Sequence, residues 1–307
     1  MGIGNQPISV AAAWVPALVA GTLLLLGAVD LAAGNGPCVI DDKEREVCLS
    51  RPAERIIALS PGVTELLFAA GAGDRIIGAV RYSDYPEAAN ELPRVGNHTR
   101  VDMETVLAMD PDLIVAWVSG NAPEQIDRLE QLGLTVYYSE VRNFDDVARS
   151  IRRFGTLAGT GAKAEQAAAD FSADLDRLNQ TYGDRDPVRL FYQVWDDPLM
   201  TVNDTHLISQ IIDLCGGHNV FAELDRMVPR LDRESVLAAR PEAIAAGGMG
   251  EDDESWLEPW KQFDQLPATA RGNLFFVPPS TIQRPTPRVV EGAEILCEHL
   301  ETARGRR

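Results

Sequence analysis

An eleven-residue stretch, ETVLAMDPDLI at residues 104–114, recurs as ESVLAARPEAI at residues 234–244, 130 positions later (234 − 104). In both copies a helical pattern ends at a proline and an apolar segment follows. A repeat at matching places in the two halves predicts two lobes of related architecture. The plainer interpretation is that any helix-to-strand junction has this pattern.

Short apolar runs alternate with helical patterns around both copies. The run RIIALSP at 55–61 predicts a strand stopped by a proline turn, and the helical pattern after it ends at Gly71. Further strands are expected at 76–80, 113–117, 135–138, 189–195, 243–246 and 273–277, and helices at 103–109, 123–132, 206–214, 234–239 and 287–300. This alternation predicts an α/β fold with mostly parallel sheets that are covered on both faces.

Residues 144–183 lack strand signals and are rich in Ala, Glu, Asp, Arg and Leu, which favour a helix. We therefore expect one long helical connector, with Gly155, Gly159 and Gly161 as candidate breaks. The predicted organisation is a leader at 1–33, a hairpin segment at 34–54, an N-terminal lobe at 55–143, the connector at 144–183 and a C-terminal lobe at 184–307.

The leader has the features of a secretory signal. Residues 11–29 carry no charge, and Leu31-Ala32-Ala33 supplies small residues for cleavage, so we expect an exported, periplasmic protein whose signal peptide is removed. Residues 1–10 lack Lys and Arg, and the apolar stretch is long enough to span a bilayer. An uncleaved N-terminal anchor is therefore the alternative.

Composition limits the partners. The chain of 307 residues, 45% of them hydrophobic, is large enough for two cores. Its 28 basic and 46 acidic residues give a net charge of −18. That charge repels nucleic acid and anionic membrane surfaces, although it also serves ordinary solubility.

Four cysteines agree with export to an oxidising compartment. Cys38 and Cys48 flank a predicted hairpin turn, which would bring them together. Cys215 and Cys297 are then left to pair with each other across the second half of the chain. None of the four has the spacing of a metal or redox motif, so no metal centre is expected.

Motifs for catalysis are missing from the sequence. It has no nucleophile elbow, Walker loop, dinucleotide glycine fingerprint or HExxH, so we expect a protein that is not an enzyme. The four histidines are widely separated, which disfavours a carrier of free metal ions. An extracytoplasmic enzyme on the same scaffold and a membrane-anchored sensor are the alternatives from other functional classes.

Several aromatic residues directly follow predicted strands, where open parallel sheets bind their ligands. They are Tyr82, Tyr85, Trp117 and Trp195. Flat rings at such positions suit a large, partly apolar ligand. The alternative for Trp117 and Trp195 is a place in the core of each lobe.

Together these motifs resemble the helical-backbone solute-binding proteins of ABC importers, and within them the periplasmic cobalamin-binding proteins. The resemblance covers residues 55–300 and rests on RIIALSP at 55–61, TEL at 64–66, YSDYP at 82–86, PDLIVAW at 111–117 and LCGG at 214–217. It implies two Rossmann-like lobes joined by one long α-helix, and cobalamin or a related corrinoid bound between them. It also implies a monomer without a resident cofactor.

The resemblance also assigns roles to residues. Tyr82 would contact the ligand, and Ser280, Thr281, Ile282, Gln283 and Arg284 would form a second wall; with Tyr85, His98, Trp117 and Trp195 they are the candidate ligand-binding residues. The pair Cys215 and Cys297 matches the family's disulfide. Glu104 and Glu234, which open the two copies of the repeat, would dock onto the permease subunits of the importer. Equivalent charges suit a twofold-symmetric partner, although helix dipoles alone also favour acids there.

The sequence departs from the family pattern at three pocket positions. His98, Val228 and Thr281 stand where tryptophans line the family's pocket, which removes aromatic surface. A ferric siderophore or haem is therefore the alternative ligand, and Arg81, Arg94, Arg100 and Arg284 lie near the predicted cleft. His98 is either an exposed loop residue or a group that approaches the ligand's metal. The Cys38–Cys48 hairpin is an addition to the pattern.

Overall fold

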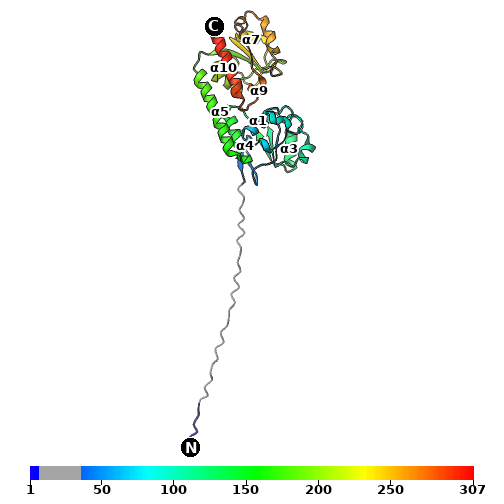
Figure 1. The fold of residues 1–307 in the computed structure, drawn as a ribbon, viewed down its shortest axis with the longest axis vertical. Helices are drawn as coiled ribbons and strands as arrows, with labels where there is room; N and C mark the ends of the chain where they lie inside the picture. Colours follow the sequence, from blue (N-terminus) through cyan, green and yellow to red (C-terminus); the bar gives the residue numbers. More distant parts are fainter. Residues whose placement is uncertain (7–35) are drawn as a thin grey trace. The chain divides into compact units, whose positions relative to one another are not determined.

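Two parallel four-stranded sheets organise the computed structural model, which describes residues 1–6 and 36–307 (Figure 1). The strands of the first lobe are β3 (Ile56–Ala58), β4 (Ile76–Ala79), β5 (Leu113–Trp117) and β6 (Val136–Ser139), in the order β4-β3-β5-β6. Those of the second lobe are β7 (Val188–Gln193), β8 (Gly217–Asn219), β9 (Ala243–Ala246) and β10 (Leu274–Phe276), in the order β10-β9-β7-β8. In each lobe the first strand lies between the second and the third, so both lobes share one topology. The two-lobed α/β fold is confirmed.

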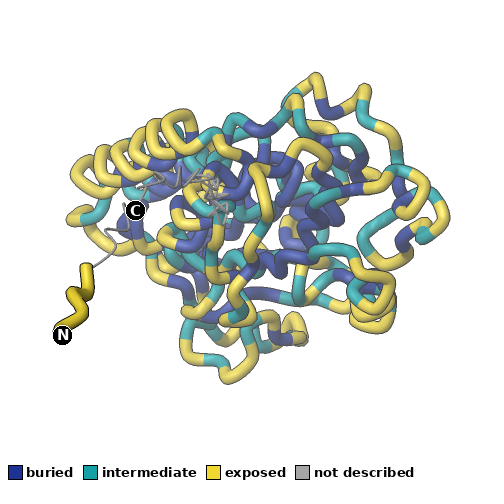
Figure 2. The backbone as a smooth tube through the Cα atoms, turned by 90° about the horizontal axis from the view of Figure 1, so that it is seen from below, coloured by how far each residue is buried: buried dark blue, intermediate teal, exposed yellow. Residues whose placement is uncertain are grey.

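The strands are apolar because helices cover both faces of each sheet. Every residue of β3 and β9 is buried, which explains why both segments are continuous apolar runs. The helices of the first lobe are α1 (Pro61–Ala69), α2 (Met103–Ala108) and α3 (Pro123–Gln131), and those of the second are α6 (Leu207–Leu214), α7 (Arg233–Ala239), α8 (Pro267–Ala270), α9 (Pro279–Ile282) and α10 (Val289–Gly305). Three short 3-10 helices are η1 (Gly73–Arg75), η2 (Glu87–Glu91) and η3 (Ser255–Gln262). In Figure 2 the exposed residues gather on the outer turns of the tube.

The sequence repeat corresponds to a repeated structural unit. Asp102 caps α2 by accepting a hydrogen bond from the Thr105 backbone N–H at 3.1 Å, and Asp232 caps α7 by accepting one from Ser235 at 2.8 Å. The helices lead into β5 and β9, which are the third strands of their lobes. Equivalent capping and equivalent topology support a shared unit rather than a chance pattern.

The end of the repeated unit is fastened in the same way in both lobes. The Asp112 carboxylate accepts a hydrogen bond from the Arg55 backbone N–H at 3.0 Å, and the Glu242 carboxylate accepts one from Arg189 at 3.1 Å. Arg55 and Arg189 precede or lie in the first strand of each lobe. An acidic residue thus ties the start of the third strand to the first strand in both lobes.

The connector is two helices rather than one helix over 144–183. Helix α4 (Phe144–Ala158) ends at Gly159, whose φ of 68° lies in the left-handed region, and α5 (Gly161–Tyr182) follows. The two helices lie side by side (Figure 1), and a Cβ at Gly155 would come within 2.2 Å of the Ala164 Cβ. This approach requires glycine. The long helix that joins the lobes is α5, which contacts α1 of the first lobe and α6 and α10 of the second.

Both predicted disulfides are present. Cys38 and Cys48 are paired across the antiparallel hairpin of β1 (Cys38–Ile40) and β2 (Glu46–Cys48). Cys215 and Cys297 join the end of α6 to α10, and both are fully buried. The hairpin packs on the first lobe, where Arg45 forms an ion pair with Glu130 at 2.7 Å.

The predicted signal peptide at 1–33 lies largely outside the described residues, because positions 7–35 are not described. Within residues 1–6 and 36–307, no helix is both long enough and apolar enough to cross a membrane. Residues 36–307 lie in one compact unit.

We expect the Cys215–Cys297 disulfide to contribute more stability than the Cys38–Cys48 disulfide. Sequence separations of 82 and 10 residues correspond to about 4.5 and about 2.7 kcal/mol in the chain-entropy model. Urea denaturation of the Cys215→Ala/Cys297→Ala and Cys38→Ala/Cys48→Ala double variants measures both values. Equal losses of unfolding free energy in the two double variants would contradict the entropic account.

Candidate ligand-binding cleft

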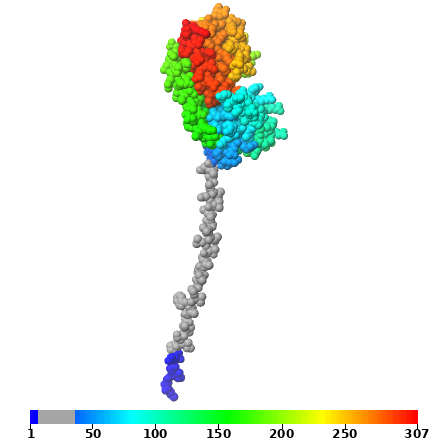
Figure 3. Space-filling model, in the orientation of Figure 1, coloured from blue at the N-terminus to red at the C-terminus, as the bar shows by residue number. Residues whose placement is uncertain are grey.

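A cleft of about 500 Å³ opens between the two lobes. Trp117 and Ser139 end β5 and β6, Tyr82 follows β4, and Trp195 follows β7. The carboxyl ends of parallel strands are the expected ligand sites of such sheets. The remaining lining residues are Ser60, Pro61, Gly62, Val63, Leu66, His98, Val141, Gln283, Arg284 and Pro285. Figure 3 shows first-lobe residues in blue and cyan against second-lobe residues in red and orange.

The aromatic residues of the cleft are exposed, although they are large and apolar. Tyr82 is 71%, Trp117 36% and Trp195 42% exposed. The two tryptophans are therefore not core residues, which was the alternative. Tyr82 has a φ of 66°, a left-handed conformation that is uncommon outside glycine and concentrates at functional sites. The rings present contact area without a rearrangement of the backbone.

A buried amide that the sequence analysis missed positions the first-lobe wall. The Asn121 side chain accepts a hydrogen bond from the Trp117 N–H at 2.6 Å and donates to the carbonyls of Leu59 at 2.9 Å and His98 at 2.7 Å. One side chain thereby fixes the ends of two strands and the His98 loop. The His98 and Trp117 ring centroids lie 6.1 Å apart. No motif marks Asn121 in the sequence, since its three partners are distant or are backbone atoms.

A smaller chamber of about 240 Å³ continues the cleft, since it shares Trp117, Val141, Gln283 and Pro285 with it. The other lining residues are Ser119, Glu140, Arg142, His206, Leu207, Met227, Val228 and Ile282. Val228, one of the positions that depart from the family pattern, is 36% exposed at this wall. The chamber adds an apolar wall and two paired charges to the cleft.

The second wall is only partly as predicted. Gln283 and Arg284 line the cleft and Ile282 lines the chamber. Ser280 and Thr281 are buried at 7% and 5% exposure and do not line either space. Ser280 donates a hydrogen bond to Glu251 and Thr281 donates one to a backbone carbonyl, so both support the wall from behind.

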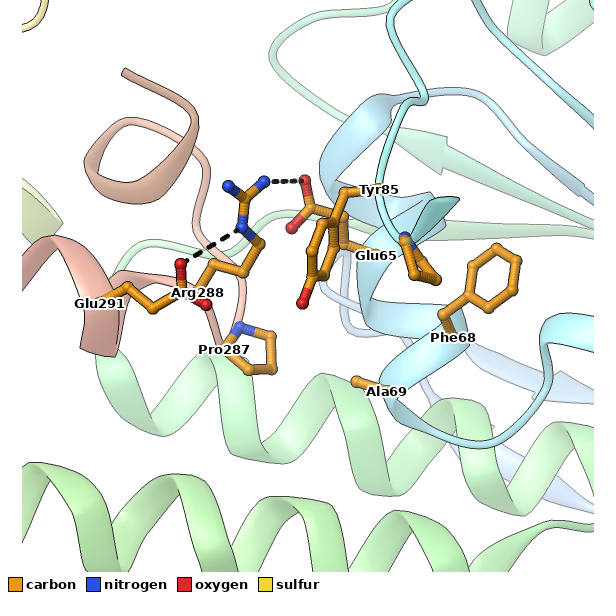
Figure 4. Close-up of a pocket in the computed structure, with 8 residues that line it drawn as sticks. Glu65, Phe68, Ala69, Tyr85, Pro287, Arg288 and Glu291 are labelled. Carbon is orange, nitrogen blue, oxygen red and sulfur yellow. Dashed lines mark ion pairs between the residues drawn. The ribbon is translucent and has the colours of Figure 1, made fainter. Parts of the chain in front are cut away.

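Tyr85 is also away from the cleft. It lines a separate pocket of about 360 Å³ (Figure 4), where the Arg288 guanidinium lies 4.2 Å from the centroid of its ring. Arg288 pairs there with Glu65 and Glu291, each at 3.9 Å. Tyr85 therefore packs at the junction of the lobes instead of facing the ligand cleft.

A buried carboxylate connects this pocket to the cleft. Glu65 lies on α1, is 4% exposed, and accepts hydrogen bonds from Arg284 at 3.0 Å and from the Thr286 hydroxyl at 2.9 Å. Arg284 also donates to Asp84 at 2.6 Å. The residues 284–288 of the second lobe are thus fastened to the first lobe by charged hydrogen bonds.

The pKa values in this cluster follow from burial and charge. Burial raises the pKa of Glu65 and outweighs the opposing effects of Arg284 and Thr286. Burial acts in the same direction on Asp84, but the hydrogen bond and charge of Arg284 prevail and lower the pKa of Asp84. Burial tends to lower the pKa of Arg284, and its two carboxylate partners raise it. Arg284 is therefore a charged residue held by two acids.

Three of the four arginines that were expected near the cleft do not line it. Arg81 and Arg100 line a different surface pocket of about 550 Å³, and Arg94 donates a hydrogen bond to the Ser83 carbonyl. Only Arg284 is a cleft residue.

The candidate docking residues occupy equivalent exposed positions. Glu104 and Glu234 lie in the first turns of α2 and α7, and both are exposed. Neither carboxylate forms an ion pair with a residue in the described part of the chain.

Within the described ranges, one group of residues has the spacing of metal ligands: Cys38, Glu46 and Cys48. Both sulfurs belong to a disulfide and are not available as thiolate ligands. This group does not form a metal site.

Two sheets of equal topology, a helix packed against both lobes and an exposed aromatic cleft between them define a two-lobed solute-binding protein. The comparisons with known proteins agree with this class. The chain belongs to the periplasmic binding protein family, which matches residues 56–281.

Curated relatives cover most of the chain. A vitamin B12-binding protein of Vibrio parahaemolyticus is 34% identical over 258 residues, which are 84% of this chain and 93% of that protein. A vitamin B12-binding protein of Vibrio cholerae is 35% identical over 252 residues, covering 82% of this chain and 91% of its own length.

Solved structures show the same fold. The periplasmic vitamin B12-binding protein BtuF of Vibrio cholerae matches with a TM-score of 0.75 and 35% identity, covering 82% of this chain and 98% of that structure. The periplasmic heme-binding protein RhuT from Roseiflexus sp. RS-1 matches with a TM-score of 0.73 at 21% identity, covering 82% of this chain and 99% of its own, and shows the fold alone.

We expect His206 to make stability fall as the pH is lowered. Its Nδ1 accepts a hydrogen bond from the Ile208 N–H at 3.1 Å, and burial lowers the pKa of His206 from 6.5 to about 4. Between these values the unfolded chain takes up a proton that the folded protein does not, so stability is present above pH 6.5 and is lost toward pH 4.

The matched variant is His206→Asn, which retains a capping side chain without a titrating group. Because the imidazole is partly exposed, we expect wild type to lose about 1 to 2 kcal/mol more than this variant between pH 7 and 4.5. The measurement is the free energy of unfolding in urea across this pH range. If it changes equally with pH in wild type and in His206→Asn, His206 does not titrate in this way.

Proposed function

We propose that this protein binds cobalamin, or a closely related corrinoid, in the cleft between its lobes and delivers it to an ABC importer. The observation that carries the proposal is the exposed aromatic set of Tyr82, Trp117 and Trp195, contributed by both lobes to one preformed cleft. A corrinoid is a broad, flat macrocycle, and such rings bury much apolar area at low entropic cost. The identity of about one third to vitamin B12-binding proteins over most of the chain supports the same ligand class.

The cleft suits binding without a large closure. The helix α5 packs against both lobes, and the Glu65–Arg284 contact fastens them on the cleft side. A preformed site loses less entropy when the ligand binds than a site that must first be ordered. Binding therefore rests on ring contacts and a few polar groups such as Ser60, Ser139 and Gln283.

The departures from the family pattern change how the ring contacts are supplied. Thr281 is buried behind the wall, whereas His98 lies in the cleft beside Trp117. Trp195 supplies a ring from the second lobe, where it makes an edge contact with Trp256 at 5.7 Å between centroids. These rings offset the aromatic surface that is absent at positions 98, 228 and 281.

The other parts of the proposal follow from the family. Its members are binding proteins, and we propose no catalysis for this chain. We also propose that the leader is removed on export to the periplasm, and that Glu104 and Glu234 dock onto basic residues of the permease subunits. Their equivalent positions on α2 and α7 fit a partner with twofold symmetry.

We expect Tyr82→Ala to weaken the binding of cyanocobalamin about tenfold, because it removes an exposed ring from the cleft. The matched control is Tyr85→Ala, which removes the same side chain from the separate pocket. Isothermal titration of residues 34–307 with cyanocobalamin measures both. Equal losses of affinity in the two variants would contradict the assignment of the cleft. The absence of binding by the wild-type protein would overturn the proposed ligand.

We expect Glu104→Lys/Glu234→Lys to abolish corrinoid uptake in cells while binding in solution is retained, because both residues are exposed and remote from the lining of the cleft. Glu124→Lys is the control, since Glu124 is an exposed first-turn acid of α3. Uptake that survives the double reversal would leave both glutamates only the role of first-turn acids favoured by the helix dipole.

A further inference from the structure

The ligand cleft contains a cation that is already neutralised. Arg284 is the one arginine that lines it, and its guanidinium pairs with Asp84 at 2.6 Å and with Glu65 at 3.0 Å. No lysine lines the cleft or the chamber in the described part of the chain. A ligand that enters the cleft therefore meets a guanidinium whose charge is balanced before the ligand arrives.

The chamber that continues the cleft repeats this arrangement. Arg142 is the arginine of its wall, and its Nε lies 3.6 Å from the Glu140 carboxylate, which lines the same chamber. Both guanidinium groups that a ligand can reach are thus paired with acids from the protein itself.

Charge counting across the lobe junction gives the same result. Arg284 and Arg288 contribute two positive charges, and Glu65, Asp84 and Glu291 contribute three negative ones. Arg288 is on the Tyr85 side of the junction (Figure 4) and does not line the cleft. The whole chain carries a net charge of −18, so its long-range field does not attract anions either.

We infer that Asp84 and Glu65 determine charge selectivity: by neutralising Arg284, they make the cleft favour an amide-bearing macrocycle without net charge over an anionic one. This inference deepens the proposed function and rests on it. Haem carries two propionates and ferric catecholate siderophores carry net negative charge, whereas the corrin ring of cobalamin carries amides. Asp84 acts through Arg284 and is a specificity-determining residue that does not itself line the cleft.

The physical basis is competition for one guanidinium. Asp84 and Glu65 use three of the five N–H groups of Arg284, so a ligand can still reach the others. An anionic ligand that does so lies close to the carboxylates of Asp84 and Glu65, whose charges repel it. Glu65 is too deeply buried to move into water, at 4% exposure. An amide ligand accepts a hydrogen bond from Arg284 without displacing either acid. Selectivity against anions thus comes from repulsion by the two carboxylates as well as from the lack of an unpaired cation in the cleft.

Asp84→Asn tests this inference, because the Asp84 side chain is 51% exposed and its loss leaves Arg284 with one partner. The matched control is Asp174→Asn on α5, whose side chain is 49% exposed and also pairs with an arginine, Arg177 at 3.2 Å. Both variants remove one negative charge from the protein. The probes are haemin and cyanocobalamin, titrated in parallel against residues 34–307 by quenching of tryptophan fluorescence.

We expect Asp84→Asn to shift the ratio of haemin to cyanocobalamin affinity about tenfold toward haemin, and Asp174→Asn to leave the ratio within twofold of wild type. The shift should shrink at high salt, because it is electrostatic. An unchanged ratio in Asp84→Asn, or an equal shift in both variants, would overturn the inference. If neither wild type nor the variants bind cyanocobalamin, the proposed function is rejected. In that case a rise in haemin affinity confined to Asp84→Asn would still support charge selection.

A second variant separates selectivity from structure. In an Arg284→Met background the cation is absent, so Asp84→Asn should no longer raise haemin affinity. A rise that persists in this background would show that Asp84 acts on the shape of the loop and would contradict the role of Arg284. Glu65→Gln, with the same volume as the native residue, provides an independent removal of one acid, and we expect it to shift the ratio in the same direction as Asp84→Asn.

Discussion

The cleft depends on one buried carboxylate. Glu65 on α1 accepts hydrogen bonds from Arg284 and from the fully buried Thr286, both on the segment that forms the second wall. A buried charge is tolerated only when it is paired and fully hydrogen-bonded, so Glu65 dictates where residues 284–286 must lie. Because Glu65 belongs to the first lobe and Arg284 to the second, the same contacts fix the wall, the lobe junction and the state of charge of the cleft.

The fold was largely predictable because it rests on local patterns. Strand β5 and strand β9 have the bounds that the apolar runs predict, and the repeat at 104–114 and 234–244 indicated the shared topology. The connector over 144–183 is two helices rather than one, and the break falls at Gly159, one of the candidate breaks that the sequence marks. Gly155 allows α4 to pack closely on α5, and Gly159 turns the chain between them. The sequence shows the glycines but not the helix against which they pack.

The site was predicted only in part, again because tertiary contacts decide where some of its residues lie. Aromatic residues that follow strands could be located from the order of elements, as Tyr82, Trp117 and Trp195 show. Tyr85, three residues after Tyr82, lies in another pocket because Arg288 of the second lobe stacks on it. Asn121 and Glu65 escaped notice, since all of their partners except Trp117 are 23 to 221 positions away in the chain. Resemblance and spacing locate walls, whereas the pairing of buried polar groups decides which residues of a wall face the ligand.

The duplication is retained at one end of the lobes and lost at the other. The caps Asp102 and Asp232 remain equivalent, which keeps the exposed edges of α2 and α7 alike. At the cleft, however, the position 130 residues after Trp117 is Gly247. A Cβ there would lie 2.6 Å from the Gln283 side-chain nitrogen, so a side chain at this position would displace the Gln283 amide from the end of β9.

The first lobe thus contributes a ring where the second contributes room for an amide. The proposed twofold-symmetric importer would favour equivalent outer edges, whereas a single ligand without that symmetry favours unlike inner walls. These two pairs of positions therefore differ as the proposed function requires, with equivalent outer edges for docking and unlike inner walls for one asymmetric ligand.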